Sequence, residues 1–143
     1  MYSKENLTPY QKDVYAGKIC PACKSTTMIK TEMEVYGRNF TGKQIITCIN
    51  FPKCDNYVGT HKDGTALGRL AGQQLRLMKK KTHDIFDAIW KNHYMERGDA
   101  YKEMSEFLNL DPELTHIGYF NYKTCEKVFL WAQNLYVELS TKK

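Results

Sequence analysis

The sequence lacks a long hydrophobic run. Across its 143 residues, no apolar stretch approaches the ~18–20 residues that a membrane-spanning helix requires. The polar start of the chain, residues 1–15, contains no hydrophobic core of a secretion signal. We therefore expect a protein without membrane association that resides in the cytoplasm. Its 42% hydrophobic and 26% charged residues are ordinary for a folded protein.

The sequence also lacks the common signatures of catalysis. It contains no HExxH motif, glycine-rich phosphate-binding loop, nucleophile elbow or paired-carboxylate pattern. His83 and Asp87 are one helical turn apart and could share a face, so a catalytic role is the lesser alternative. We expect a protein that is not an enzyme.

Acidic residues are absent between Asp63 and Asp84. Five basic residues occupy this stretch: Arg69, Arg76, Lys79, Lys80 and Lys81. The formal net charge of the chain is only +5, so the distribution of charge matters more than its sum. An acid-free basic stripe can bind the phosphates of a nucleic acid, and the alternative is an ordinary solvated helix face.

The five cysteines are few but informative, because four of them form two pairs. Thiolates at this spacing can close tetrahedrally on one zinc ion, and a reducing compartment favours metal binding over disulfides. A closed four-cysteine site has no open position for water, which predicts a structural metal. The predicted ligands of this single zinc ion are Cys20, Cys23, Cys48 and Cys54. His61 and His116 are possible alternate ligands, although we expect structural roles for both.

The side-chain pattern between the cysteine pairs predicts β-structure. Side chains alternate between apolar and polar over 27–36, which predicts a strand, and a turn follows at Gly37. A second strand is predicted over 40–47 and a third over 56–59. A sheet of about 40 residues buries too little apolar surface to fold alone, so zinc would supply much of its folding free energy.

After the second cysteine pair the hydrophobic period becomes helical. Apolar residues recur every three or four positions and predict a helix over 65–92, with Gly68 and Gly72 weakening its first turns. Two more helices are predicted over 99–110 and 122–139, the last capped by Asn121. Cys125 falls on the apolar face of the last helix and is expected in the core. The predicted fold is α+β: a small antiparallel zinc ribbon followed by a three-helix segment.

These elements suggest three parts along the chain. An N-terminal arm spans 1–19, the zinc ribbon spans 20–60, and a helical region spans 61–143. We expect the helical region to pack on the ribbon.

Aromatic and basic residues alternate on the predicted ribbon. Bases of a nucleic acid can stack on such rings while cations hold its phosphates. The alternative is that the rings only cover a small core. The candidate nucleic-acid-binding residues of the ribbon are Lys30, Tyr36, Arg38, Phe40, Lys43, Phe51, Lys53 and Tyr57.

Residues 20–55 resemble the zinc ribbons in the C-terminal tail of bacterial type IA topoisomerases. The shared features are the CPxC knuckle, Tyr36-Gly37 and Phe40 in the hairpin, and Phe51-Pro52 before the last cysteine. In that family the ribbons bind single-stranded DNA through aromatic and basic side chains. The resemblance implies the same kind of binding here.

Nearly the whole chain resembles the zinc-finger-containing domain family (DUF3268) of phages and bacteria. The resemblance rests on these segments: the CPxC knuckle, Gly42-Lys43-Gln44, Cys54 to Gly59 with His61, Leu67 to Ala71, Ala100-Tyr101, and His116 to Phe120 with Cys125. The second knuckle, Cys48 to Cys54, is longer than the CxxC typical of the family. The resemblance implies a small accessory protein of phage or mobile-element type and identifies no reaction.

Together these observations predict a non-catalytic zinc-ribbon protein that binds nucleic acid, with single-stranded or double-stranded DNA favoured over RNA. If a phage encodes it, its location is the host cytoplasm. The alternative function is a protein–protein module that inhibits or recruits a host enzyme through the ribbon surface.

Overall fold

The computed structural model describes residues 2–142, and its contacts divide the chain into two compact units. One unit spans Leu7–Gln74. The other combines the start of the chain through Asn6 with everything from Leu75 onward. Among the described residues, no helix is both long enough and apolar enough to cross a membrane. The predicted division into 1–19, 20–60 and 61–143, and the packing of the helical region on the ribbon, stay predictions.

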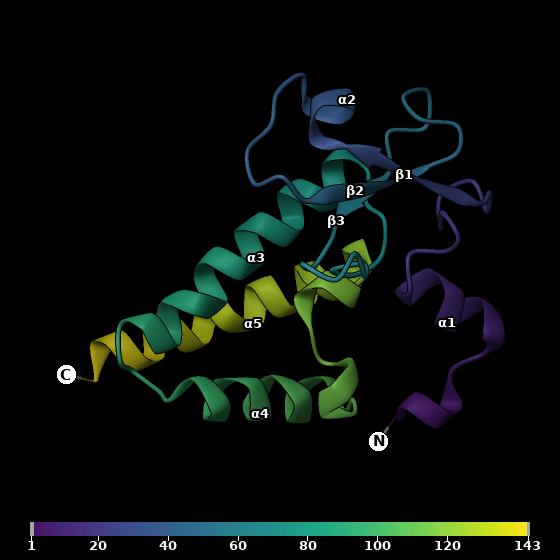
Figure 1. Cartoon of the computed structure of the whole chain (residues 1–143). Helices are drawn as coiled ribbons and strands as arrows, with labels where there is room; N and C mark the ends of the chain where they lie inside the picture. Colours follow the sequence, from purple (N-terminus) through teal and green to yellow (C-terminus); the bar gives the residue numbers. More distant parts are fainter. Residues whose placement is uncertain (1, 143) are drawn as a thin grey trace. The chain divides into compact units, whose positions relative to one another are not determined.

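The first unit is built on a three-stranded antiparallel sheet in the order β1-β2-β3 (Figure 1). Its strands are β1 (Thr27–Thr31), β2 (Gln44–Cys48) and β3 (Tyr57–Gly59). The central strand β2 pairs Ile46 with Ile29 on one side and with Val58 on the other. A short helix, α1 (Pro9–Tyr15), precedes the sheet and begins at a capping box in which Thr8 and Gln11 bond each other's backbone. This sheet, with the helices of the chain, confirms the α+β class.

The predicted strand over 27–36 is wrong in its second half. After Thr31 the chain forms the helix α2 (Glu32–Tyr36). The Thr31 hydroxyl accepts from the Glu34 amide, and the Glu34 carboxylate accepts from the Thr31 amide, which closes a capping box. Gly37 ends the helix at φ 80°, a left-handed conformation that glycine adopts without steric cost. Local capping therefore overrides the two-residue alternation that favoured a strand.

The second and fourth predicted elements begin later than expected. The predicted strand over 40–47 starts at Gln44, because residues 38–43 form a loop. The predicted helix over 65–92 is α3 (Gln73–Lys91). Before it, Ala71 pairs its backbone with Tyr57, which requires an extended chain. The Asp55 carboxylate then accepts from the Gln73 amide and satisfies one of the free N–H groups at the helix start.

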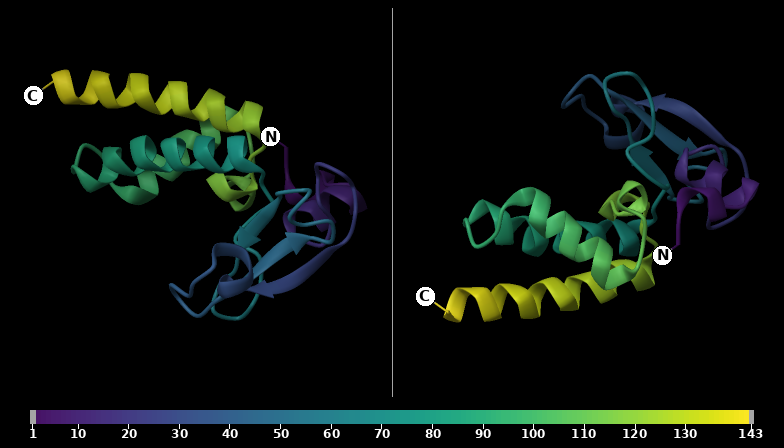
Figure 2. Two further views of the ribbon diagram at one scale, coloured as in Figure 1. Left: turned by 90° about the horizontal axis from the view of Figure 1, so that it is seen from above. Right: turned by 90° about the horizontal axis from the view of Figure 1, so that it is seen from below.

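The second unit is a helical assembly. Besides α3 it contains α4 (Arg97–Leu108) and α5 (Tyr122–Thr141), with short 3-10 helices at Lys4–Asn6, Pro112–Leu114 and Ile117–Tyr119. The helices α3 and α5 run side by side (Figure 2). The predicted N-cap is confirmed, since Asn121 Oδ1 accepts from the Thr124 amide at 2.9 Å. The middle helix begins and ends two residues earlier than the predicted 99–110, and Asn109 closes it in a left-handed conformation.

Each unit has its own buried core. The helical core includes the fully buried Phe86, Ile89, Met104 and Val128, and Phe86 meets Tyr101 edge-on with ring centres 4.9 Å apart. Cys125 is buried in this core, as predicted. The core of the ribbon unit is smaller, and two of its members, Cys20 and Cys48, are cysteines of the predicted zinc site.

Candidate metal centre and nucleic-acid surface

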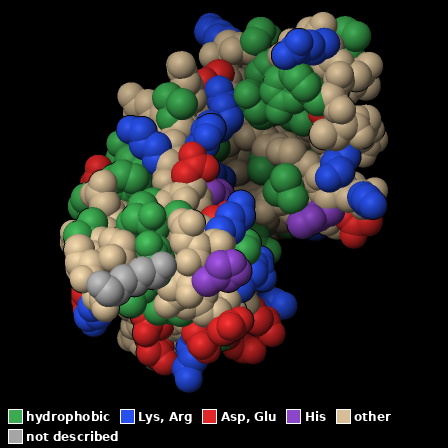
Figure 3. Space-filling view, turned by 90° about the vertical axis from the view of Figure 1, so that its left-hand side faces the viewer, with side chains coloured by type: hydrophobic (Ala, Val, Ile, Leu, Met, Phe, Trp, Pro, Cys, Tyr) green, Lys and Arg blue, Asp and Glu red, His purple; other side chains and the backbone are tan. Residues whose placement is uncertain are grey.

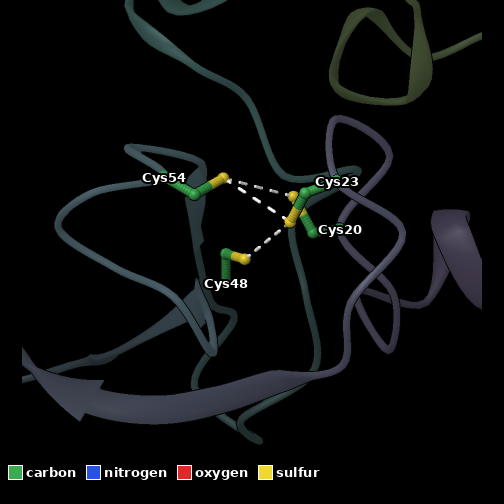
Figure 4. Close-up of side chains that lie close together, drawn as sticks. All are labelled: Cys20, Cys23, Cys48 and Cys54. Carbon is green, nitrogen blue, oxygen red and sulfur yellow. Dashed lines mark hydrogen bonds between the residues drawn. The ribbon is translucent and has the colours of Figure 1, made fainter.

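The four paired cysteines converge on one point in the ribbon unit (Figure 4). Cys20 and Cys23 come from the knuckle before β1, Cys48 ends β2, and Cys54 closes the loop before β3. All four sulfur atoms lie within 4.8 Å of one another. Three of the separations are 3.2 Å for Cys23–Cys48, 3.7 Å for Cys20–Cys54 and 3.9 Å for Cys23–Cys54.

This cluster fits a tetrahedral zinc ion. With Zn–S bonds of about 2.3 Å, the sulfurs of a tetrahedral site stand ~3.8 Å apart. These three separations need only small shifts to reach that geometry, and no two of the four sulfurs are more than 4.8 Å apart. Four thiolates are also the donor set of structural zinc sites. The four cysteines can therefore hold one zinc ion and leave no ligand position open for water.

Two asparagines donate hydrogen bonds to the sulfurs. The backbone N–H of Asn50 donates to Cys48 Sγ at 3.5 Å, and the side-chain Nδ2 of Asn50 donates to Cys23 Sγ at 3.8 Å. The Asn56 side chain donates to Cys54 Sγ at 3.5 Å. Such bonds stabilise negative charge on sulfur and orient the ligands. The sequence patterns did not indicate either asparagine, although each stands two positions after a predicted ligand, in Cys48-Ile-Asn50 and Cys54-Asp-Asn56.

The thiols differ in their readiness to ionise. Burial raises the pKa of Cys48 to about 12 and raises that of Cys20 above its ordinary value. Hydrogen bonds from the Ser25 side chain, from Cys48 and from the Ser25 backbone lower the pKa of the exposed Cys23 to about 6. A zinc ion that binds here must therefore displace protons from the buried sulfurs, and its affinity must fall as the pH falls.

No histidine joins the cysteine cluster. Within residues 2–142, the group whose atoms are close enough to share a metal consists of the four cysteines alone. His61 is exposed, and its amide bonds the Thr65 carbonyl in a turn. His116 lies against the Tyr119 ring in the helical unit.

The four predicted ribbon aromatics form a continuous strip. Tyr36 meets Phe40 with ring centres 5.6 Å apart and meets Tyr57 at 5.9 Å. Phe51 meets Tyr57 at 6.0 Å, and all three contacts are edge-to-face. Phe40 is 57% exposed and Tyr36 42% exposed, whereas Tyr57 and Phe51 are half-buried. We call these four residues the aromatic strip.

The predicted ribbon cations differ in their surroundings. The guanidinium of Arg38 lies 4.5 Å from the centre of the Phe40 ring, so Arg38 borders the aromatic strip. Lys43 and Lys53 are exposed. Lys30 is half-buried and its ammonium lies 4.0 Å from the Glu34 carboxylate, within the same segment of chain.

The predicted basic helix stripe is wrong in one respect, because Arg69 precedes α3 and its guanidinium lies over the Tyr15 ring. On α3, Lys79 Nζ donates to the Gly118 carbonyl at 2.9 Å. Lys80 pairs with Asp84 at 2.9 Å. Of the other two stripe residues on α3, Arg76 is half-buried and Lys81 exposed. On the face drawn in Figure 3, Lys and Arg side chains are scattered, with Asp and Glu among them.

The chain belongs to the family of zinc-finger-containing domains (DUF3268), whose model matches residues 16–135. This match covers both the cysteine cluster and most of the helical unit. No curated protein and no solved structure matches the chain. The family and the cysteine geometry together make this a zinc-binding module.

Proposed function

We propose that this zinc-binding module is a non-catalytic nucleic-acid-binding protein that takes single-stranded DNA on the aromatic strip. The observation that supports the proposal most is the strip itself: four rings of the ribbon unit in continuous contact, carried by α2, β3 and the loops beside them, with two of the rings substantially exposed. Exposing large rings in water is unfavourable, and a ligand with flat apolar faces would cover them.

Single strands suit this surface better than duplexes. Bases of a single strand are free to leave their own stack and lie on aromatic rings, and each such contact contributes roughly 1–3 kcal/mol. A duplex keeps its bases stacked inside and offers mainly phosphates. Phe40 and Tyr36 are 57% and 42% exposed, so both rings have surface that a base could cover, and Arg38 over the Phe40 ring lies where it could meet a phosphate.

We assign phosphate binding to cations of the ribbon unit, of which Arg38 borders the strip. Arg38 borders Phe40, and Lys43 and Lys53 are exposed on the same unit. Three phosphate contacts to a single strand predict a slope of about −2 for log affinity against log salt. Lys79 and Lys80 are engaged within the helical unit, so we assign the α3 cations an auxiliary role.

A binding titration tests the proposal. Labelled single-stranded and duplex oligonucleotides are titrated with the zinc-loaded chain at two salt concentrations. We expect tighter binding of single strands and a loss of about tenfold or more for Phe40→Ala or Tyr36→Ala, from the removal of a stacking surface. Tyr10→Ala is the matched control, because Tyr10 is 41% exposed and lies on α1, outside the strip.

Absence of single-strand binding even at about 50 mM salt would rule out the proposal, because low salt favours every phosphate contact. Equal losses for Tyr10→Ala and Tyr36→Ala would place binding elsewhere. The wider role proposed here, an accessory protein of phage or mobile-element DNA metabolism in the cytoplasm, rests on the family resemblance and on this activity.

A second candidate function is supported by apolar side chains on β1 and α2. Ile29 is 58% exposed and Met33 50% exposed, and neither can stack a base. Such residues fit a protein partner, for example a host enzyme. Co-purification of a host protein after nuclease treatment, abolished by Ile29→Ser, would favour this function.

A further inference from the structure

Glu32 is a buried carboxylate at the start of α2, only 4% exposed. Its Oε1 accepts from the amides of Phe40, Thr41 and Gly42 at 3.2, 2.9 and 2.7 Å. Its Oε2 accepts from the Thr41 hydroxyl at 3.0 Å. Burying a carboxylate is costly unless such bonds compensate, so the four bonds tie α2 to the loop 38–43. Figure 1 shows this loop leaving α2 and returning to β2.

The loop forms an anion-binding nest that its own chain fills. Three successive N–H groups point at one oxygen, as they do in backbone sites for phosphate. Burial alone would raise the pKa of Glu32, but the bonds from Thr41, Gly42 and Phe40 hold it below its usual value. The carboxylate therefore stays ionised at neutral pH, and the loop offers a ligand its side chains instead of these amides.

The same carboxylate fixes the exposed end of the aromatic strip. Glu32 and Tyr36 stand one turn apart on α2, and Glu32 holds the backbone of Phe40. The rings of Tyr36 and Phe40 are the pair 5.6 Å apart. Arg38, over the Phe40 ring, belongs to the same loop. Glu32 thus links the two elements that carry the most exposed rings.

We propose that Glu32 is a positioning residue for single-strand binding, which holds the loop 38–43 so that Phe40 and Arg38 stand beside Tyr36 before the ligand arrives. The inference rests on the proposed function and adds the group that preorganises its site. The charge of Glu32 alone would repel phosphates, so its contribution comes from the shape it imposes on the loop.

Three substitutions separate shape from charge. Glu32→Gln removes the charge but keeps an oxygen at the position that accepts three amides. Glu32→Asp keeps the charge but withdraws the carboxylate by about one C–C bond, ~1.5 Å. Glu32→Ala removes both. We expect Glu32→Gln to bind single strands with an affinity within about threefold of native. Glu32→Asp and Glu32→Ala should each lose about tenfold in affinity, because their loop is mobile and must be ordered on binding.

A charge effect would give a different order. If the negative charge mattered for itself, Glu32→Gln and Glu32→Ala would both bind tighter, and Glu32→Asp would resemble the native chain. A double-mutant comparison of Glu32 with Phe40 supplies a second test. In a Phe40→Ala background, Glu32→Ala should add little further loss, because both changes remove the same stacking surface.

Glu34→Ala is the matched control. Glu34 is an exposed carboxylate on the same helix, and its Oε1 accepts from Thr31 and not from the loop amides. Glu34→Ala removes half of the capping box of α2 but leaves the loop amides bonded to Glu32, so we expect its single-strand affinity within about threefold of native. An equal loss for Glu34→Ala and Glu32→Ala would overturn the inference, since the effect would then belong to α2 as a whole.

The outcomes separate the two proposals. Suppose that Glu32→Asp and Glu32→Ala bind zinc and bind single strands with native affinity, while Phe40→Ala binds them more weakly. This result overturns the role of Glu32 and leaves the proposed function intact. A native chain that binds no single strand overturns the proposed function. If Glu32→Ala loses zinc, the Gln and Asp variants are compared at full zinc occupancy. Amide exchange at 40–42 should accelerate in Glu32→Asp and stay slow in Glu32→Gln, and the reverse order contradicts the inference.

Discussion

The two units of this chain reach a folded state by different means. The helical unit buries Phe86, Ile89 and Met104 among many apolar neighbours, so its stability comes from hydrophobic burial. The ribbon unit has a small core in which two of the buried residues are zinc-site cysteines, Cys20 and Cys48. Its sheet therefore depends on what binds those sulfurs. When a metal contributes the stability that a hydrophobic core would otherwise supply, the aromatic rings of a small unit need not all be buried. In the ribbon unit Phe40 and Tyr36 stay exposed.

Zinc removal should produce the largest difference in stability between the two units. Structural zinc contributes roughly 10 kcal/mol in isolated zinc peptides, more than a small sheet can replace. Chelation should therefore abolish slow amide exchange in β1, β2 and β3 while α4 and α5 keep theirs. Hydrogen exchange resolved by segment measures this, with metal analysis giving one zinc per native chain. Uniform loss of protection in both units would contradict separate sources of stability.

Phe86→Ala should produce the converse effect. Phe86 is fully buried between Tyr101 and Trp131, and its truncation leaves a cavity that costs about 3–5 kcal/mol. The helical unit should unfold at lower denaturant concentration, while the zinc content stays at one ion per chain. Denaturant titration with metal analysis checks both. Loss of zinc at denaturant concentrations where the helices remain folded would contradict this assignment.

Acid should affect the ribbon unit before the helical unit. The pKa values of Cys20 and Cys48 lie above their ordinary value of 9.0, so both thiols are protonated at neutral pH when metal is absent. Zinc must displace at least these two protons, so its apparent affinity should fall by at least about 100-fold per pH unit. Below about pH 6 the Cys23 thiol, with its pKa of about 6, adds a further proton and steepens the fall. Competition with a chelating dye across pH 5.5–7.5 measures this slope, and a pH-independent affinity would contradict it.

Asn56→Ala should produce the smallest effect. The Asn56 side chain donates to Cys54 Sγ, and removing such a bond weakens metal affinity by about 10–100-fold. The variant should keep its fold at saturating zinc and lose zinc earlier in a chelator titration. Asn92→Ala, an exposed residue after α3, serves as control and should retain native affinity.

The sequence predicts the metal site well because its information is local. Knuckle spacing alone identified Cys20, Cys23, Cys48 and Cys54, and the structure brings these four sulfurs together. The N-cap at Asn121 was also predictable, since the cap bonds an amide three residues away. Features that depend on partners far away in the sequence were not predictable in this way. The capping box of Thr31 and Glu34 that starts α2 is local and was overlooked, whereas the bonds from Glu32 that hold α2 reach a loop eight to ten residues further on.

The start of α3 was missed for the same physical reason. Residues 65–72 carry helical periodicity, yet Ala71 pairs with Tyr57 and the helix begins where Asp55 meets Gln73. These partners lie fourteen to eighteen residues away and leave no periodic signal. Part of the basic stripe was misplaced for the same reason, because Arg69 lies outside the helix. Asp84, just beyond the acid-free window, pairs with Lys80, and phosphate binding by the stripe stays a prediction.

The most direct test of the account is to map a bound single strand on the zinc-loaded chain by NMR. A short oligonucleotide should shift signals of Tyr36, Phe40, Phe51 and Tyr57 and of the loop 38–43, and should leave the core of α4 and α5 unchanged. This result would place binding on the unit that zinc stabilises. Shifts concentrated in α3 to α5, or no shifts at saturating oligonucleotide, would contradict the central claim that the zinc-held ribbon unit presents the binding surface.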